Sequence, residues 1–500
     1  MKGFILHISR PALLLAIAVG LASCNDAWEN TQKEEERFGT SLQVTVRVNG
    51  DSRQGLTRTQ DDGPAGGEDG DGREQGSENE YRVDNATLLL YRDANGINST
   101  NNPLIEYALY APVMEKEDKG DGKIYYSSDV LHYKDPLPRG EFHAIILANM
   151  GDCTGLKGRT LAEVRDMTVE SPFTIRRDAK GQPDIAGAGN FVMTSARDAS
   201  FVTSGEGGPV SGNIIHVEAP VERLAARIDF SPGPLAATLP EDGGYALWVE
   251  NESVTLEEEG VTTATSLTGY KYVVLDATTK APTRDRFILT GVTPFNCLTS
   301  GTCCIKRVRN NLQGGGTRLV YLGNETVDAS GGATNYVPDP WTMNKNSSTD
   351  PAGLEYRNRL TSPNQLLDKD KHWPVRPETE LFTPTITPSA DLQYYILDYT
   401  QENTLLPGFG KERYATGLLI TGYYGCADEN GNIEKYLPQN YHYYIRHADP
   451  NGSSDESLPM KYGIVRNNIY RIHVNSINSL GQIQIVVNDW KRIDVPEIQI

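Results

Sequence analysis

Cys24 is the residue whose neighbours most clearly predict a chemical modification. A positively charged start with Lys2 and Arg10 precedes an apolar run from Ala12 to Ala22, and Leu21-Ala22-Ser23 leads into Cys24. This order of a basic start, an apolar run and small residues before a cysteine is typical of a lipoprotein signal peptide. The apolar run is too short to span a bilayer, which takes roughly 20 residues. We therefore predict that residues 1–23 are removed and that the thiol of Cys24 carries a lipid.

Two arginines after an isolated strand predict a second processing reaction. Apolar and polar residues alternate from Leu42 to Val48, which is the pattern of a half-buried strand. Residues 59–80 are rich in Gly, Asp and Glu and predict a disordered linker, because they cannot bury enough apolar surface to order themselves. Proteases need exposed and flexible backbone, and Arg58 and Arg53 lie where the chain becomes exposed, so a protease would cut there. The strand that such a cut would remove is defined by its apolar residues: Leu42, Val44, Val46 and Val48.

The last residues of the chain form a second candidate for exchange between chains. Apolar and polar residues alternate from Arg492 to Ile500. A sheet that has lost a strand has unpaired backbone groups and an apolar groove, and it readily accepts a strand from another chain. The apolar face changes side at Pro496-Glu497, where a bulge would realign it. In the alternative reading, this segment is the last strand of its own sandwich. The predicted donor residues are Ile493, Val495, Ile498 and Ile500.

Other reactive side chains do not form a catalytic pattern. The sequence has no phosphate-binding loop, zinc-protease motif or nucleophile elbow. His442 and His473 lie in strand-like runs and are interpreted as structural. Cys297 is close enough to Cys303 or Cys304 for a small disulfide loop, and their spacing does not favour zinc. We predict no catalytic residue, no metal site and no cofactor.

Tyrosine pairs offer one weaker binding hypothesis. Tyr270 with Tyr272, and Tyr423 with Tyr424, would line a glycan platform if their rings were exposed. Strand tyrosines more often cover a sheet, which is the preferred interpretation.

Composition limits the fold and the partners. The 500 residues are 38% hydrophobic and 23% charged, which predicts a chain that buries a core. The formal charge of -19 has the wrong sign for binding phosphates, so nucleic acid is excluded as a partner. Many turn residues and 25 tyrosines favour an all-β exported protein.

Strand patterns fall into two groups that meet near residue 220. We predict an N-terminal β-sandwich over residues 59–219 and a C-terminal one over residues 220–500, following a propeptide over residues 24–58. Helices are few and short, with Leu161 to Met167 as the best candidate. Asn430-Gly431 predicts a type I′ hairpin turn. Residues 328–388 are rich in Pro, Asn and Ser and predict a long surface loop.

Several segments resemble the fimbrillins of Bacteroidales, the major subunits of type V pili. The resemblance lies in the lipobox at Cys24 and in four further segments spread over most of the chain, although residues 328–388 have no counterpart. The four segments are Phe142 to Asn149, Val221 to Asp229, Asn467 to Ile477 and Val487 to Trp490.

This resemblance implies two transthyretin-like β-sandwiches in tandem. It also implies that the protein exists first as a precursor and then as an assembled subunit. The precursor would be an outer-membrane lipoprotein held by the lipid on Cys24. After cleavage at Arg58 or Arg53 by an Arg-specific surface protease, the C-terminal strand of a neighbouring subunit would replace the first strand, building a fimbrium that supports adhesion and biofilm. The acidic linker is longer than the family pattern suggests, so Arg73 and Arg82 stay open as cleavage sites.

Alternative functions remain within and outside this family. An anchor subunit would keep its lipid, and a tip subunit would lack a polymerising C-terminal extension. Outside the family, the alternative is a monomeric surface lipoprotein that binds glycans. Partners are expected to be other fimbrial subunits, with host or bacterial surface glycans or proteins as open adhesion targets.

Overall fold

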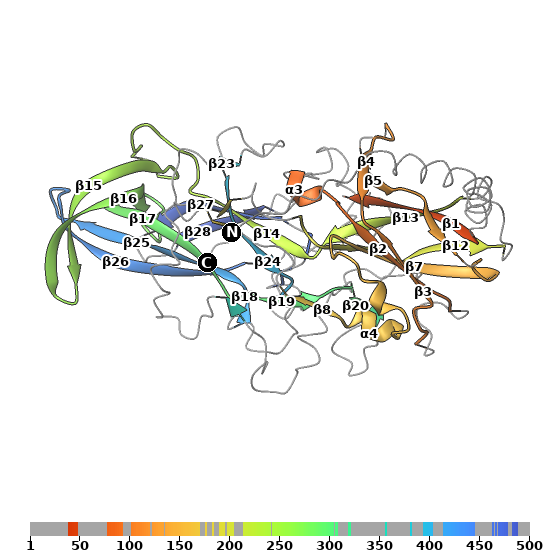
Figure 1. Cartoon of the computed structure of the whole chain (residues 1–500). Helices are drawn as coiled ribbons and strands as arrows, with labels where there is room; N and C mark the ends of the chain where they lie inside the picture. Colours follow the sequence, from red (N-terminus) through yellow and green to blue (C-terminus); the bar gives the residue numbers. More distant parts are fainter. Residues whose placement is uncertain are drawn as a thin grey trace, which may run out of the picture.

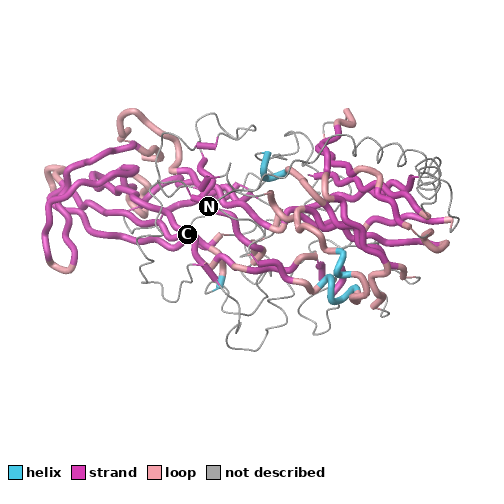
Figure 2. The backbone as a smooth tube through the Cα atoms, viewed as in Figure 1, coloured by secondary structure: helices cyan, strands magenta, loops and turns pink. Residues whose placement is uncertain are grey.

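The protein is described here from a computed structural model, in which strands dominate and two sheet bodies lie end to end (Figures 1 and 2). The structure describes residues 39–48, 78–93, 102–120, 123–134, 136–170, 176–177, 183–184, 190–195, 198–204, 214–241, 243–304, 306–308, 319–321, 356–357, 381–382, 394–403, 414–445, 463–464, 466–467, 469–478 and 483–488. The expectation of an all-β chain with two sandwiches in tandem and few short helices is confirmed.

The first body contains ten paired strands. Eight follow the order β3-β2-β7-β11-β13-β1-β5-β4, while β12 pairs with β7 and β6 pairs with β1. Their bounds are β1 Thr40–Val48, β2 Ala86–Tyr91, β3 Tyr107–Ala111, β4 Met114–Glu117, β5 Ile124–Ser128, β6 Leu131–Tyr133, β7 Gly140–Ala148, β11 Met193–Ser195, β12 Ala199–Thr203 and β13 Ile214–Arg223.

One apolar core fills this body because its sheet folds over at the short strand β11. Leu88 of β2 and Ile146 of β7 belong to the same buried cluster as Val44 of β1 and Val221 of β13. The strands on either side of β11 therefore face each other as two layers, as expected for a sandwich. Strand β1 lies inside its layer, between β13 and the pair β5 and β6.

The second body also contains ten paired strands. Its order is β15-β26-β25-β17-β16-β27-β14-β24-β23, and β28 pairs with β27. The bounds are β14 Ala225–Ser231, β15 Leu247–Glu258, β16 Val261–Leu275, β17 Pro282–Phe295, β23 Leu381–Phe382, β24 Tyr394–Gln401, β25 Gly417–Ala427, β26 Ile433–Tyr444, β27 Ile469–Asn478 and β28 Ile483–Asn488.

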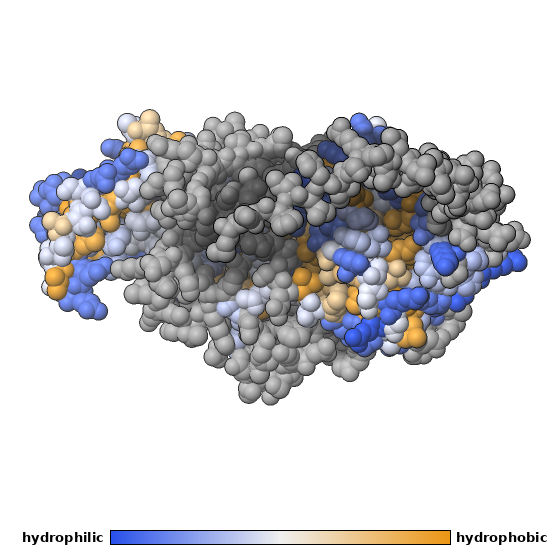
Figure 3. All heavy atoms as spheres, in the orientation of Figure 1, coloured by the Kyte–Doolittle hydropathy of each residue, from blue (hydrophilic) through white to orange (hydrophobic). Residues whose placement is uncertain are grey.

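Five strands of the second body close on themselves at its far end. Strands β15 and β16 pair directly, and Leu256 of β15 also bridges to Tyr436 of β26, so β15, β26, β25, β17 and β16 form a ring. Gly269 permits close packing here, because an added Cβ would lie 2.1 Å from the oxygen of Leu289. Figure 3 shows hydrophilic residues along the rim of this end, with hydrophobic residues between them.

The hairpin turns show where the prediction from dipeptides was wrong. Asn430-Gly431 lies in a three-residue loop whose ends are joined by the bond from Asp428 N to Asn432 O, and of the two residues Gly431 alone has a positive φ. A type I′ turn needs positive φ at both central residues. That condition is met at Glu259-Gly260, between β15 and β16, with φ of 49° and 82°.

Short elements join and cover the two bodies. Helix α4 (Leu161–Arg165) begins with a capping box between Thr160 and Glu163, so the predicted helix is present but shorter than expected. Helix α3 (Glu78–Tyr81) occupies the end of the predicted linker, whose residues 59–77 lie outside the described residues. Strand β8 (Thr168–Glu170) pairs with β19 (Ser300–Thr302), which brings a segment following β17 onto the first body.

The remaining described elements are short. They are η3 Thr154–Leu156, and the pairs β9 Arg176–Arg177 with β10 Pro183–Asp184, β18 Cys297–Leu298 with β22 Tyr356–Arg357, and β20 Lys306–Val308 with β21 Leu319–Tyr321.

Candidate functional site

The predicted removable strand is completely embedded in the first body. Leu42, Val44, Val46 and Val48 of β1 are each at most 1% exposed. Burying one such side chain contributes about 1.5–3 kcal/mol, so the four together contribute roughly 6–12 kcal/mol. Because whole domains are stable by only about 5–15 kcal/mol, the first body depends on a strand at this position.

Backbone pairing holds both edges of β1. It runs parallel to β13 from Ser41, opposite Ile214, to Val48, opposite Val221. On its other edge it pairs antiparallel with β5 and β6. We call the space that β1 fills the slot. Loss of β1 would leave two rows of unpaired N–H and C=O groups, one on each side of the slot.

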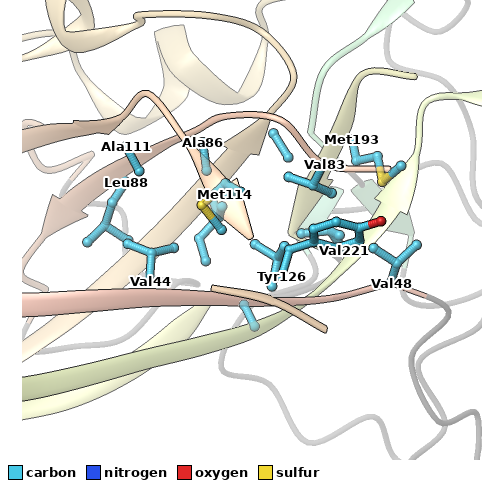
Figure 4. Packing of buried hydrophobic residues seen from close by; sticks show 14 of the residues in the cluster. Val44, Val48, Val83, Ala86, Leu88, Ala111, Met114, Tyr126, Met193 and Val221 are labelled. Atoms are coloured by element: carbon cyan, nitrogen blue, oxygen red, sulfur yellow. The ribbon is translucent and has the colours of Figure 1, made fainter. Parts of the chain in front are cut away.

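Apolar side chains from the opposite layer and from other strands of the same layer line the slot (Figure 4). Val44 lies below Leu88 and Met114, and Val48 lies beside Val221, as the labelled side chains show. All of these residues belong to one buried cluster. The slot therefore selects for apolar side chains at alternate positions of the occupying strand.

Polar residues of β1 add a few contacts on the other face. Gln43 Nε2 donates to the oxygen of Ser128 at 3.0 Å, and the hydroxyls of Thr45 and Ser127 lie 2.8 Å apart. The buried Arg47 Nε has no hydrogen-bond partner among the described residues. These contacts are few, so occupancy of the slot depends mainly on apolar burial and backbone pairing.

A second buried site, made of charges, lies where the two bodies meet. Arg227 of β14 is 2% exposed at its side chain and contacts Asp229 at 2.7 Å and Glu80 of α3 at 3.1 Å. Tyr399 of β24 donates to Glu80 at 2.8 Å. Burial alone would lower the pKa of Arg227, but the charges of Asp229 and Glu80 raise it, so Arg227 stays cationic.

Arg466 forms a further contact between the bodies. Its guanidinium donates to the oxygens of Thr302 and Cys303 at 2.6 and 2.7 Å, and it pairs with Glu402 at 2.9 Å. The side chain is 1% exposed. We call these residues, Glu80, Arg227, Asp229, Tyr399, Glu402 and Arg466, the charged junction.

Most predicted processing and exchange residues lie outside the described residues. This holds for Cys24, Arg53, Arg58 and Arg73, and for the donor residues Ile493, Val495, Ile498 and Ile500. Arg82 is described, and it pairs with Asp84 at 2.7 Å on the surface. Their predicted roles stay predictions.

The histidine interpretation agrees with the contacts, whereas one tyrosine hypothesis was wrong. His473 is partly buried against the hydroxyl of Tyr394 at 3.3 Å, and burial lowers its pKa to about 4. Tyr270 and Tyr272 are at most 3% exposed and pack in the second core, so they cannot form a glycan platform. Tyr423 and Tyr424 are half-buried.

The described cysteines form no disulfide, and the described residues contain no group suited to hold a metal ion. Cys153, Cys297, Cys303, Cys304 and Cys426 are all free thiols, so the disulfide loop suggested for Cys297 is not formed. Among the described residues, no group of His, Cys, Asp and Glu could hold a metal ion. No helix within the described ranges is long and apolar enough to cross a membrane.

Comparison with known proteins points to one family. Residues 438–496 match the family model described as major fimbrial subunit protein type IV, fimbrillin, C-terminal. A search of curated protein sequences gave no significant match.

Solved structures of fimbrial and cell adhesion proteins also match this chain. The tip fimbrial protein Mfa3 of Porphyromonas gingivalis, with a C-terminal truncation, is 10% identical, with 90% of this chain and 99% of that chain covered and a TM-score of 0.34. A putative cell adhesion protein of Parabacteroides distasonis is 12% identical, with 90% and 97% covered and a TM-score of 0.38. The fimbrial anchor protein Mfa2 of P. gingivalis is 8% identical, with 90% and 97% covered and a TM-score of 0.27.

All three TM-scores are below 0.5, so the likeness to fimbrillins depends on the sequence match at residues 438–496. That match includes β27, β28 and most of β26. It confirms the resemblance noted from the sequence, because residues 438–496 of this chain are similar to the C-terminal region of fimbrillins.

Proposed function

We propose that this protein is a stalk pilin, a structural subunit of a cell-surface fimbria that supports adhesion and biofilm. In this proposal it is exported as an outer-membrane lipoprotein precursor and held by the lipid on Cys24. An Arg-specific protease cuts at Arg58 or Arg53, and residues 493–500 of a neighbouring subunit enter the slot.

The observation that carries the proposal is the position of β1. The strand lies inside a layer, yet it is linked to the next described element only through residues 49–77, which contain both candidate arginines. A cut in that segment severs β1 while leaving the backbone from β2 to β28 intact. An emptied slot exposes a large apolar surface, and this surface favours capture of another strand.

The donor segment matches the slot in length. β1 pairs with β13 over eight residues, from Ser41 to Val48, and residues 493–500 are also eight. An incoming strand reproduces the pairing with β13 if it runs parallel to β13. Ile493 with Val495, and Ile498 with Ile500, fit alternate inward positions if a bulge at Pro496 absorbs the change of face.

Processing is tested by digesting the purified full-length precursor with an Arg-specific protease. We expect a new N-terminus after Arg58 or Arg53 and a ladder of polymers on a gel run without boiling. The double variant Arg53→Gln/Arg58→Gln should stay intact and monomeric, while Arg139→Gln, an exposed arginine of the first body, should behave as wild type. Trimmed protein that stays monomeric under all conditions would contradict the stalk function.

Strand donation is tested by deleting residues 493–500. The deleted chain should fold and be trimmed but should not polymerise, and Ile498→Asp should act in the same direction. Gln499→Ala is the matched control, because its side chain alternates with the apolar ones. Undiminished polymer after the deletion would rule out this donor segment.

The mature N-terminus on cells separates the remaining functions. A chain that begins at a blocked Cys24 supports an anchor subunit or a monomeric lipoprotein. Thermal stabilisation by a saccharide, increasing with its concentration, would support the glycan-binding monomer. A chain that begins after an arginine supports the stalk function.

A further inference from the structure

Three thiols from distant parts of the sequence meet beside the charged junction. Cys153 lies in the loop after β7, and Cys303 and Cys304 follow β19. All three belong to, or pack against, one apolar cluster on the outer face of β2 and β7. Cys303 is fully buried and Cys153 is half-buried, so Cys153 is the more accessible residue of the two.

The sulfur atoms of Cys153 and Cys303 approach the same residue. Cys303 Sγ lies 3.7 Å from Met150 Sδ, and Cys153 Sγ lies 3.8 Å from the oxygen of Met150. Cys304 Sγ lies 4.0 Å from the oxygen of Val164 in α4. Cys303 Sγ therefore lies near the loop that contains Cys153, and Cys304 Sγ lies near the helix.

Hydrogen bonds fix both backbones at this place. The N–H of Cys303 donates to the oxygen of Met167 at 2.7 Å, and Arg466 and Thr194 donate to the oxygen of Cys303. The N–H of Cys153 donates to the hydroxyl of Thr87 at 3.1 Å. A disulfide forms only over a short range of Cα separations, so the pairing requires the loop of Cys153 and the segment of Cys303 to approach within that range.

We propose that Cys153 and Cys303 form a disulfide that ties the loop after β7 to the segment crossing from the second body. The oxidant is a disulfide, either glutathione disulfide or the disulfide of a thiol oxidoreductase. The Cys153 thiolate attacks one oxidant sulfur, forming a mixed disulfide and releasing one thiol. The Cys303 thiolate then attacks Cys153 Sγ and releases the second thiol, so two protein thiols are oxidised as one oxidant disulfide is reduced.

The environment of the thiols sets the rate of this reaction. Burial raises the pKa of Cys153. A hydrogen bond with Cys304 and burial raise the pKa of Cys303, and a charge on Cys153 raises it further. Because thiolates are the reacting species, oxidation should be slow at neutral pH and faster as the pH rises.

The disulfide would make the contact between the bodies covalent. It closes a loop of about 150 residues, and closing a long loop restricts the unfolded chain more than closing a short one. We expect the melting temperature to rise by several degrees on oxidation. This inference does not depend on polymerisation, because the disulfide forms within one chain.

Mass mapping of the full chain after treatment with glutathione disulfide tests the pairing. We expect two fewer alkylatable thiols and a cross-linked peptide pair containing residues 153 and 303. Cys303 and Cys304 are adjacent and stay on one peptide, so variants must distinguish them. The cross-link should persist in Cys304→Ser and in the control Cys426→Ser, whose cysteine is exposed, and it should be lost in Cys303→Ser and Cys153→Ser.

Thermal melts give a second readout that does not depend on the peptides. The oxidation-dependent rise should appear in wild type and Cys304→Ser and be absent in Cys153→Ser. A cross-link to Cys304, a bond between Cys303 and Cys304, or a Cys153 that stays alkylatable after complete oxidation would overturn the inference. None of these results depends on whether the chain polymerises.

Discussion

The slot of β1 and the charged junction are both buried, but different groups hold them together. The slot is lined by apolar side chains and by the backbone edges of β13 and β5. The junction depends on particular guanidinium and carboxylate pairs, such as Arg227 with Glu80. Backbone pairing and apolar alternation can be supplied by another strand of suitable pattern, whereas a buried ion pair accepts few substitutes. The strand in the slot is therefore the part that the proposed function can exchange, whereas the junction depends on its own side chains.

The largest effect is expected from a charge placed in the slot. Leu42→Asp removes a fully buried leucine and leaves a carboxylate without a partner, which should cost about 5 kcal/mol. Leu42→Met keeps the volume and should cost less than about 1.5 kcal/mol. Urea unfolding of the untrimmed precursor measures both. Equal midpoints for the two variants would contradict a closely packed slot.

Breaking the ion pairs of the junction should have the next largest effect. Arg227→Met removes the cation that pairs with both Glu80 and Asp229 and leaves Asp229 only Arg471 at 3.6 Å, so the expected loss is about 3–5 kcal/mol. Arg159→Met is the matched control, because Arg159 pairs with Glu163 on the exposed surface, where such a pair contributes less than about 1 kcal/mol. Guanidinium denaturation compares them, and a loss no larger than that of the control would mean that the charges are dispensable.

A conservative change should show that the junction, unlike the slot, requires one side chain. Arg466→Lys keeps the charge but cannot reach Thr302, Cys303 and Glu402 at once, because an ammonium lacks the planar guanidinium geometry. We expect a loss of about 2 kcal/mol. Lys435→Arg, at an exposed pair with Glu257, should change stability by less than about 0.5 kcal/mol. Equal melting temperatures for the two variants would contradict the requirement for an arginine at the junction.

A smaller effect should appear in the stability of the second body, which we expect to depend on pH through His473. Burial lowers the pKa of His473 to about 4, below the value of about 6.5 for an unfolded chain. Between these values the unfolded state binds a proton that the folded state excludes, so stability falls as the pH falls from 6.5 to 4. His473→Gln should remove roughly 2 kcal/mol of this loss at pH 4.5. Denaturation midpoints at pH 7 and pH 4.5 measure it, and an unchanged acid loss in the variant would show that another group is responsible.

The local alternation of apolar and polar residues was sufficient to predict strand β1, which fills the slot. The alternation from Leu42 to Val48 predicts a strand, and the structure has β1 there with its apolar residues inward. The same pattern cannot tell whether a strand lies inside a layer or at its edge. Its position inside the layer depends on pairing with β13, which lies some 170 residues away in the sequence. The residues of β1 alone carry no signal for a partner that distant.

The junction illustrates what sequence reasoning missed. Arg227 and Asp229 stand two apart in an otherwise apolar strand, which was the available signal that a charge pair is buried on one face. Glu80 gave no such signal, because it follows a polar stretch that reads as linker. It is buried because α3 places it against Arg227 and Tyr399 from the second body.

The sequence alone determined that the chain is all-β, that its first strand alternates and is followed by candidate cleavage sites, and that its segments resemble fimbrillins. These properties depend on periodicity, composition and short motifs, which neighbouring residues carry by themselves. The tertiary structure decided that β1 lies inside its layer, that Glu80 joins the two bodies and that Cys153 and Cys303 both contact Met150. Each of these depends on contacts between residues far apart in the chain, whose free energies exist only when the whole fold brings them together.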